Sequence, residues 1–426
     1  MRNLLSVTFF SGMLTLTRMM SGFVIAKVIS VYTGPTGLAL LSQLQNFNSI
    51  ATGLLTSSVN QGVVRYTAEN KNRSFKECSQ WWKGGLAISL TIVSIFSPII
   101  LLFAPSITHF LLGDKKLYPY VIVVIIISPF SILGTLMLSV LNGLQQYRRY
   151  IMISIVSVIM SCVMMVLLIQ SYGVNGALIS ASIQNGVIGA IVLIFVSRQP
   201  WFKLNLFLGR IDKRHFLGMS SYTLMAIVSA IALPFTQIAI RYIMVNKIGW
   251  DRMGQWQAVW KISEVYLSVI TISLSTYFLP KLATLTSMAQ IQGEIKSVSK
   301  IVLPVVIIMA LCIYFLRDLI ITILFTEHFT ESHRYFAVQL IGDVVKIMSW
   351  LYAYPMISRG MVKIYICTEI IFSILLILLS YFLINIYGAH GANYAYLITY
   401  LIYFFAIFSF MHHLTRRELN ENFAGR

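Results

Sequence analysis

The stretch Tyr172-Gly173-Val174-Asn175-Gly176-Ala177 returns 215 residues later as Tyr387-Gly388-Ala389-His390-Gly391-Ala392. Further matches keep nearly the same spacing: Arg148 with Lys363, Tyr150 with Tyr365, residues 27–31 with residues 241–245, and Gly37 with Gly254 if the second turn is three residues longer. A fixed spacing across half of a chain indicates internal duplication. We therefore expect the chain to fold as two related halves.

The composition is that of a membrane protein. Of the 426 residues, 58% are hydrophobic and only 11% are charged, whereas a soluble domain carries roughly 25% charged residues. Apolar stretches of about 20 residues, long enough to cross a bilayer, recur from Leu4 to Met411. The first of them continues to Val31 without a small-residue cleavage site, so we interpret it as an uncleaved spanning helix and not as a signal peptide.

The expected fold is an all-α integral membrane protein with twelve transmembrane helices in two pseudo-symmetric lobes of six. The predicted spans are 5–31, 37–64, 84–112, 117–141, 150–170, 175–197, 217–244, 254–280, 300–325, 334–357, 363–386 and 390–413. Residues 1–200 form the predicted N-terminal lobe, 201–216 a cytoplasmic linker, and 217–426 the C-terminal lobe. Because six is even, both lobes share one orientation, and a pseudo-two-fold axis along the membrane normal is expected, with the substrate path between the lobes.

The net charge of +18 follows the positive-inside rule. With the N-terminus in the cytoplasm, 21 Lys and Arg residues fall in cytoplasmic segments and six outside. Such a bias places both termini in the cytoplasm. It also explains the basic composition as a topology signal and as contact with anionic lipid, so no nucleic-acid partner is expected.

Four segments resemble the Wzx family. They are Gly34-Pro35-Thr36-Gly37-Leu38, Asn60-Gln61-Gly62-Val63-Val64-Arg65-Tyr66, Tyr277-Phe278-Leu279-Pro280-Lys281-Leu282 and Gln339-Leu340-Ile341-Gly342-Asp343-Val344-Val345-Lys346. This family comprises flippases for O-antigen units and, in a sister group, for enterobacterial common antigen lipid III. It belongs to the multidrug/oligosaccharidyl-lipid/polysaccharide exporter superfamily.

The resemblance implies a V-shaped, MATE-like bundle that works by alternating access in the bacterial inner membrane. The implied substrate is an undecaprenyl-pyrophosphate-linked oligosaccharide, moved from the cytoplasmic to the periplasmic leaflet. Bilayer lipids are implied contacts, and glycan polymerase and chain-length regulator proteins are candidate partners.

Side chains for such a substrate must be polar or cationic. Each hydroxyl taken unpaired into hydrocarbon costs roughly 4–8 kcal/mol, and cations would offset the pyrophosphate charge. The substrate-binding candidates are Arg18, Lys27, Arg241, Lys261, Gln43, Asn46, Trp256, Gln257 and Trp260.

Each group of candidates has a competing interpretation. For Lys27 and Arg241 it is snorkelling to the outer interface. For the amides and tryptophans it is interhelical hydrogen bonding or an interfacial aromatic belt. Arg18 and Lys27 can face one cavity only if Ser21-Gly22 breaks their helix, because nine residues turn a straight helix by about 180°.

The candidates for coupling or gating are Glu264, Asp343 and Lys346. Lys261 and Glu264, like Asp343 and Lys346, are spaced i,i+3, so neutralised intrahelical ion pairs are the alternative. The acidic residues within 1–214 are all assigned to loops: Glu69, Glu77, Asp114 and Asp212. The carboxylate coupling that multidrug exporters of this superfamily use in the N-terminal lobe therefore does not transfer to this chain.

Other function classes fit less well. The sequence has no P-loop, and its four cysteines are scattered, so we expect no enzyme, cofactor or metal site. The main alternative is a cation-coupled multidrug antiporter of the same superfamily. A glycan polymerase would be expected to have a large periplasmic loop, and a scaffold would not need repeated lobes with buried charges.

Overall fold

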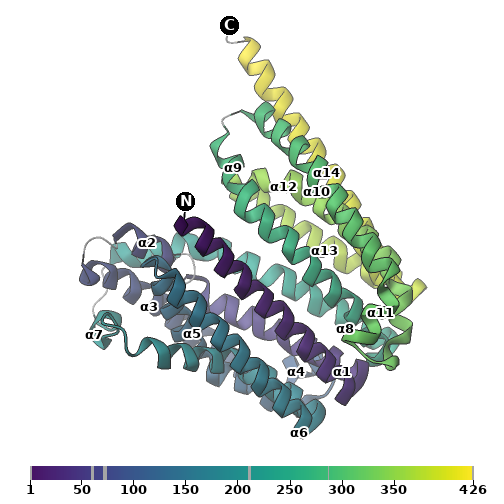
Figure 1. Cartoon of the computed structure of the whole chain (residues 1–426), viewed down its shortest axis with the longest axis horizontal. Helices are drawn as coiled ribbons and strands as arrows, with labels where there is room; N and C mark the ends of the chain where they lie inside the picture. Colours follow the sequence, from purple (N-terminus) through teal and green to yellow (C-terminus); the bar gives the residue numbers. More distant parts are fainter. Residues whose placement is uncertain (1, 59–61, 71–73, 210–212, 286, 425–426) are drawn as a thin grey trace. The chain divides into compact units, whose positions relative to one another are not determined.

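The computed structural model describes residues 2–58, 62–70, 74–209, 213–285 and 287–424. Helices make up nearly all of these ranges (Figure 1). They are α1 (Arg2–Ser58), α2 (Val64–Asn70), α3 (Phe75–Leu102), α4 (Ala104–Leu112), η2 (Lys115–Leu117), α5 (Tyr118–Gly143), α6 (Tyr147–Val196), α7 (Leu204–Phe207), α8 (Lys213–Ser273), η3 (Leu274–Phe278), α9 (Leu279–Thr284), α10 (Met288–Phe315), α11 (Arg317–Leu324), η4 (Glu327–Tyr335), α12 (Phe336–Ser358), α13 (Val362–Tyr387) and α14 (Ala389–Ala424).

Glycines break the three longest helices. α1, α6 and α8 have 57, 50 and 61 residues, which at 1.5 Å per residue would reach about 75 to 90 Å, far beyond a hydrocarbon core of about 30 Å. The backbone leaves the helical conformation at Gly34, Gly173 and Gly249, with φ of 65°, 57° and 85°. These positive φ values favour glycine, which has no Cβ. Each long helix is therefore two segments joined at a glycine.

The positive-φ residues reveal the duplication in the backbone itself. Three pairs are each 215 residues apart: Gly34 with Gly249, Gln145 with Gly360, and Gly173 with Gly388. The first pair keeps the spacing of 215 at the first turn, so the three-residue insertion expected from pairing Gly37 with Gly254 is not needed. The two halves thus turn at corresponding positions.

The chain divides into two compact units, residues 1–238 (unit 1) and residues 239–426 (unit 2). The boundary falls inside α8. The lobe limits predicted from the sequence, residues 200 and 217, remain a prediction.

In unit 1, α1 and α5 both pack on α6, and α3 packs on α5. α5 and α6 approach closely, because a Cβ added at Gly134 would lie 2.4 Å from the Cα of Gly189. Small residues at such crossings let membrane helices touch along their backbones. The apolar core includes Trp82, whose indole nitrogen donates a hydrogen bond of 2.8 Å to Thr67.

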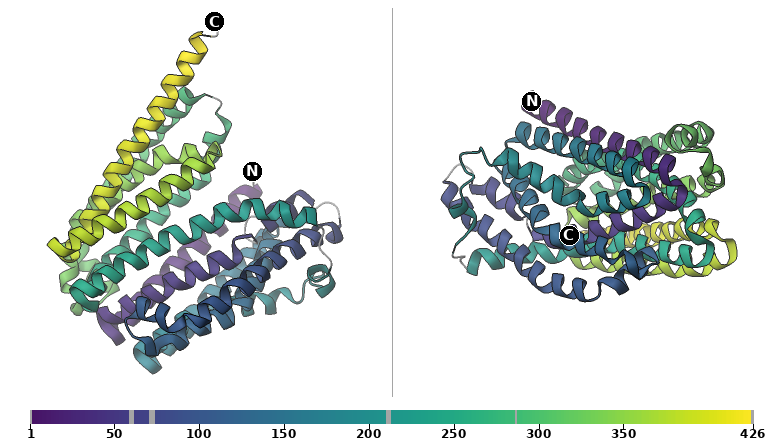
Figure 2. Two further views of the ribbon diagram at one scale, coloured as in Figure 1. Left: turned by 180° about the vertical axis from the view of Figure 1, so that it is seen from behind. Right: turned by 90° about the horizontal axis from the view of Figure 1, so that it is seen from below.

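In unit 2, α12 packs on α10 and α14, and α13 packs on α14. Figures 1 and 2 show α14, in yellow, alongside α12 and α13. Gln255 ties η4 to α8: its Nε2 donates to the carbonyl of His328 at 2.5 Å, and its Oε1 accepts from the Ser332 hydroxyl at 2.9 Å.

The fold class predicted from the sequence is confirmed as a multi-pass helical membrane protein. Among the described residues, eight helices are long and apolar enough to cross a membrane, and two of them, Phe10–Thr56 and Tyr147–Val196, each combine two expected spans. The exposed faces fit lipid contact, as Ile301, Ile308 and Phe315 of α10 illustrate. The count of twelve spans remains a prediction.

Candidate functional site

A buried carboxylate lies at the centre of unit 2. Asp343 on α12 is fully buried and accepts four hydrogen bonds. The donors are the hydroxyls of Ser263 at 2.7 Å, Tyr266 at 2.8 Å and Tyr396 at 2.9 Å, and the Nε2 of Gln339 at 3.1 Å. All four are neutral, and such bonds offset part of the large desolvation cost of a buried charge.

Lys346, one turn further along α12, lies in an aromatic cage. Its side chain is almost wholly buried, with the residue 8% exposed. Its Nζ lies over four rings, 5.0 Å from the centroid of Trp350, 5.3 Å from Tyr400, 5.6 Å from Tyr396 and 6.0 Å from Trp260. Desolvated cation–π contacts of this kind contribute about 2 kcal/mol.

The spacing of Asp343 and Lys346 suggested an intrahelical ion pair, but these two described side chains do not form one directly. The carboxylate is held by hydroxyls and an amide, and the ammonium group by aromatic rings. Hydroxyl groups from α8 and α14 bind the carboxylate directly. Asp343 and Lys346 still interact electrostatically, so the two charges remain coupled without a direct ion pair.

A cavity of about 140 Å³ adjoins Lys346. It is lined by Trp260, Ser263, Glu264, Leu267, Ser268, Thr271, Gln339, Lys346, Trp350 and Tyr396. Glu264 accepts a hydrogen bond of 2.8 Å from the Trp260 indole and lies 3.8 Å from the Nζ of Lys261. The Oε1 of Gln339 is buried and has no donor in the structure. The cavity wall thus combines a cation, a carboxylate, an amide oxygen and two indoles.

The structure brings five of the predicted residues together here: Trp260, Lys261, Glu264, Asp343 and Lys346. Arg241 is only 1% exposed and is close enough to Glu264 to interact electrostatically, so snorkelling to the interface does not describe it.

The other two predicted residues of α8 are buried outside the cavity wall. Trp256 donates a hydrogen bond of 2.6 Å to Asn393 of α14, the interhelical bond that was its competing interpretation. Gln257 is buried, and its Oε1 has no donor in the structure.

The predicted residues of unit 1 do not form a comparable cluster. α1 is unbroken at Ser21-Gly22 and is interrupted only at Gly34, so Arg18 and Lys27 point in opposite directions. Arg18 is exposed and Lys27 is half-buried. The condition under which both could face one cavity is therefore not met.

The amides predicted on the second span have different environments. Gln43 is fully buried and Asn46 is half-buried. Within the described part of the chain, neither polar atom of the Gln43 side chain has a hydrogen-bond partner, and the Nδ2 of Asn46 has none either.

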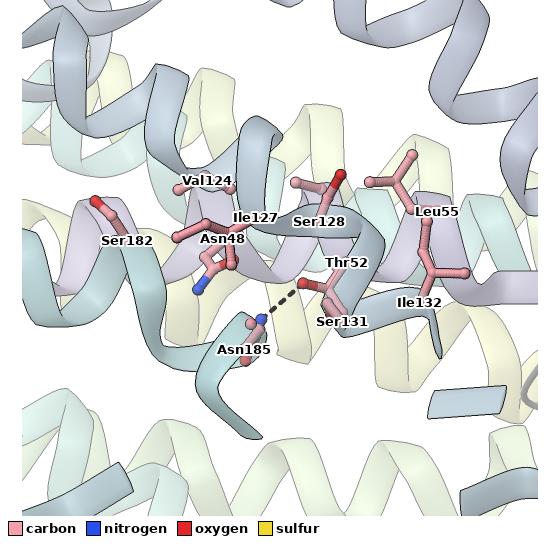
Figure 3. Close-up of a pocket in the computed structure, with 12 residues that line it drawn as sticks. Asn48, Thr52, Leu55, Val124, Ile127, Ser128, Ser131, Ile132, Ser182 and Asn185 are labelled. Carbon is pink, nitrogen blue, oxygen red and sulfur yellow. Dashed lines mark hydrogen bonds between the residues drawn. The ribbon is translucent and has the colours of Figure 1, made fainter. Parts of the chain in front are cut away.

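Unit 1 has a smaller polar pocket at another place (Figure 3), between α1, α5 and α6. Asn185 donates a hydrogen bond of 2.7 Å to Thr52, and Asn48 donates one of 3.0 Å to the carbonyl of Ala181. The open volume is only about 10 Å³, which is room for about one water molecule.

Several residues of the unit 2 cluster were not predicted from the sequence. Gln339 and Trp350 lie four residues before Asp343 and four after Lys346, so helical periodicity on α12 could have found them. Ser263, Tyr266, Tyr396 and Tyr400 come from other helices. Nothing in their local sequence indicates that they face Asp343 or Lys346.

Comparisons with known proteins support a common family and fold. The family described as polysaccharide biosynthesis protein matches residues 4–286. The chain is 27% identical to the lipid III flippases of Escherichia coli (strain K12) and Shigella flexneri, over 92% of this chain and 94% of each relative.

Solved structures share the fold at low sequence identity. An inward-facing MATE-family multidrug resistance transporter has a TM-score of 0.76 at 13% identity, covering 95% of this chain and 96% of that one. The lipid II flippase MurJ, in an inward closed conformation, has a TM-score of 0.73 at 13% identity, covering 99% of this chain and 92% of that one.

Proposed function

Because the chain belongs to the polysaccharide biosynthesis protein family, we propose that it flips an undecaprenyl-pyrophosphate-linked oligosaccharide from the cytoplasmic to the periplasmic leaflet. The observation that carries this proposal is the 27% identity to lipid III flippases, which runs through nearly the whole of both chains. The substrate is an O-antigen repeat unit or lipid III. The proposed location is the bacterial inner membrane, with both termini in the cytoplasm.

The polar interior of unit 2 supports this function physically. A charged side chain at the centre of a membrane helix costs about 2.5–3.5 kcal/mol on insertion scales, and α12 carries both Asp343 and Lys346 in its buried part. Intramembrane charges of this kind by default mark a substrate or ion pathway. A glycan head group needs such a path, because its hydroxyls cannot enter hydrocarbon unpaired.

The coupling role is assigned to Asp343, with Glu264 and Lys346 beside it. Glu69 and Glu77 were expected in loops but lie on α2 and in the first turn of α3, whereas Asp114 lies just before η2. Asp212 lies outside the described residues. A carboxylate that changes its protonation during transport is therefore sought on α12. The alternative, a cation-coupled multidrug antiporter, rests on fold likeness at 13% identity.

The proposal is tested by deleting the gene. A flippase defect leaves the lipid-linked unit assembled but stranded on the inner leaflet, so surface polysaccharide should disappear while lipid-linked single units accumulate. Sugar-transfer activity and drug sensitivity should not change, and a plasmid copy should restore export. Raised drug sensitivity with normal surface glycan would instead identify the antiporter. Candidate partners, glycan polymerase and chain-length regulator proteins, can be sought in the same strain by crosslinking.

A further inference from the structure

The polar pockets of the two units occupy equivalent positions in the repeat. With the spacing of 215 that the backbone shows, residues of the unit 1 pocket map onto residues of the unit 2 cluster. The pairs are Asn48 with Ser263, Thr52 with Leu267, Val124 with Gln339, Ser128 with Asp343, and Ser131 with Lys346. The duplication has therefore placed polar pockets at overlapping repeat positions in the two units, with different side chains.

Polar groups of the unit 1 pocket form hydrogen bonds within the pocket or to the nearby backbone. Its amides bond to Thr52 and to the backbone, and the Ser128 hydroxyl donates a hydrogen bond of 2.7 Å to the carbonyl of Ile125. With about 10 Å³ of open volume, it has no room for more than a water molecule. Figure 3 shows Asn185 turned toward Thr52 beside the serines. This pocket is a packed helix interface.

The unit 2 pocket is open, and some of its polar groups lack hydrogen-bond partners. Its volume of about 140 Å³ is about ten times what one water needs, which suits a ring-sized group. The Oε1 of Gln339, on a side chain that is 1% exposed, has no donor. Among the described residues, Lys346 lies over four aromatic rings and interacts electrostatically with the carboxylates of Asp343, Glu264 and Glu369, without a direct ion pair to any of them. Buried polar groups that lack hydrogen-bond partners and lie beside an open cavity point to a ligand.

The wall chemistry selects the ligand. Lys346 favours an anionic group, the Trp260 and Trp350 indoles suit the apolar face of a ring, and Gln339 and Glu264 accept hydroxyl protons. Pyrophosphate fits poorly, because it offers only acceptors to Gln339 and Glu264. A drug cation fits poorly as well, because Lys346 already occupies the aromatic cage.

We propose that the unit 2 cavity is a saccharide subsite for one acidic sugar, a hexose ring that carries a carboxylate. Lys346 binds the carboxylate, Gln339 and Glu264 accept ring hydroxyls, and the indoles of Trp260 and Trp350 pack against the ring. This subsite deepens the proposed function and rests on it, because the sugar is a part of the lipid-linked oligosaccharide.

The test uses purified full-length protein in nanodiscs, titrated with glucuronate, glucose or inorganic pyrophosphate. Binding is followed by tryptophan fluorescence and by the rise in Tm that a ligand of the folded state produces. Glucuronate should bind, and glucose at least tenfold more weakly. Lys346→Ser, which installs the residue that unit 1 has at this position, should weaken glucuronate binding at least tenfold and leave the weak glucose binding unchanged.

Two further variants control for folding. Lys346→Arg keeps the charge and should retain glucuronate binding even if Lys346→Ser folds poorly. Ser131→Ala changes the equivalent residue of unit 1 and should bind like the unchanged protein. Glucuronate binding that survives in Lys346→Ser, equal binding of glucose, or tighter binding of pyrophosphate would each overturn the subsite.

The failure of the subsite and the failure of the function are distinguishable. Free sugars report on the cavity without any transport, whereas gene deletion reports on export without any binding measurement. Normal flipping without glucuronate binding would rule out the proposed subsite but not the proposed function. If the protein binds glucuronate but deletion of its gene leaves surface glycan intact, the proposed flippase function would be ruled out and the binding site would stand.

Discussion

α5 in unit 1 and α12 in unit 2 are equivalent helices, but the buried face of α5 is neutral and that of α12 is charged. α5 presents Ser128 and Ser131, whereas α12 presents Asp343 and Lys346 at the same repeat positions. The serines lie beside a pocket with room for about one water, and the charges lie in a cluster with a cavity of about 140 Å³. The backbone breaks have been kept in both halves, and the buried side chains have changed. The same backbone arrangement therefore forms a packed interface in one unit and a polar cavity in the other.

The largest effect is expected at Asp343. Asp343→Asn keeps the side-chain volume but removes the charge and turns an amide donor toward the donors Ser263, Tyr266 and Tyr396. Export of surface polysaccharide in the deletion strain should fall at least tenfold, at normal protein level. Ser128→Asn, the matched change in unit 1, should reduce export much less. Full export by Asp343→Asn would show that the charge on α12 is dispensable.

A charge placed in unit 1 should not be tolerated. Ser128→Asp puts a carboxylate into a pocket without room for it, where Asn48, Ala51 and Ala181 stand at the positions of the donors Ser263, Tyr266 and Tyr396. The free energy of unfolding should fall by about 2.5–3.5 kcal/mol, the insertion cost of such a charge, with a lower Tm in detergent and a lower yield. A variant as stable as the unchanged protein would mean that both pockets can host charge, and the contrast between the units would fail.

The glycines at which α1 and α8 are interrupted, Gly34 and Gly249, should be equally sensitive to substitution by alanine. Gly34 and Gly249 have φ/ψ of 65°/−162° and 85°/169°, a region that is essentially restricted to glycine. An added Cβ meets no atom within 4 Å at either position, so the penalty is backbone strain of about 1–3 kcal/mol. Gly34→Ala and Gly249→Ala should therefore lower Tm by similar amounts. Gly293→Ala, in a helix and equally open, serves as the control and should not lower it.

The smallest effect is expected at the turns between equivalent helices. Gln145 adopts φ of 59° where the other unit has Gly360 at 64°, and a left-handed backbone costs a non-glycine residue roughly 1–2 kcal/mol. Gln145→Gly should raise Tm slightly, and Gly360→Gln should lower it. A fall in Tm for Gln145→Gly would mean that side-chain contacts of Gln145 outweigh its backbone strain.

The sequence was informative about the fold for a physical reason. Hydrophobic length, basic loops and the glycine repeat are local signals, and Gly173 and Gly388 are indeed equivalent turns. The turn at Gly34 was harder to align, because the neighbouring Gly37 offered a second match and hid the constant spacing.

The site was only partly predictable. Charges inside apolar helices are conspicuous, so Glu264, Asp343 and Lys346 were found. Their partners were not, because a hydroxyl such as that of Tyr396 gains its role only when α14 packs on α12. The alternative for Asp343 and Lys346, a direct intrahelical ion pair, could not be judged from the sequence for the same reason: helical spacing shows which side chains can meet, but partners from α8 and α14 decide which do.

Reconstitution in liposomes is the most direct test of whether the protein transports a lipid-linked oligosaccharide. Liposomes that contain the purified protein and the undecaprenyl-linked unit are probed with a lectin or glycosidase added outside, with and without an imposed ion gradient. We expect the accessible fraction to rise beyond that of protein-free liposomes, and Asp343→Asn to abolish the rise. Correctly folded protein that gives no added access under either condition would contradict the account.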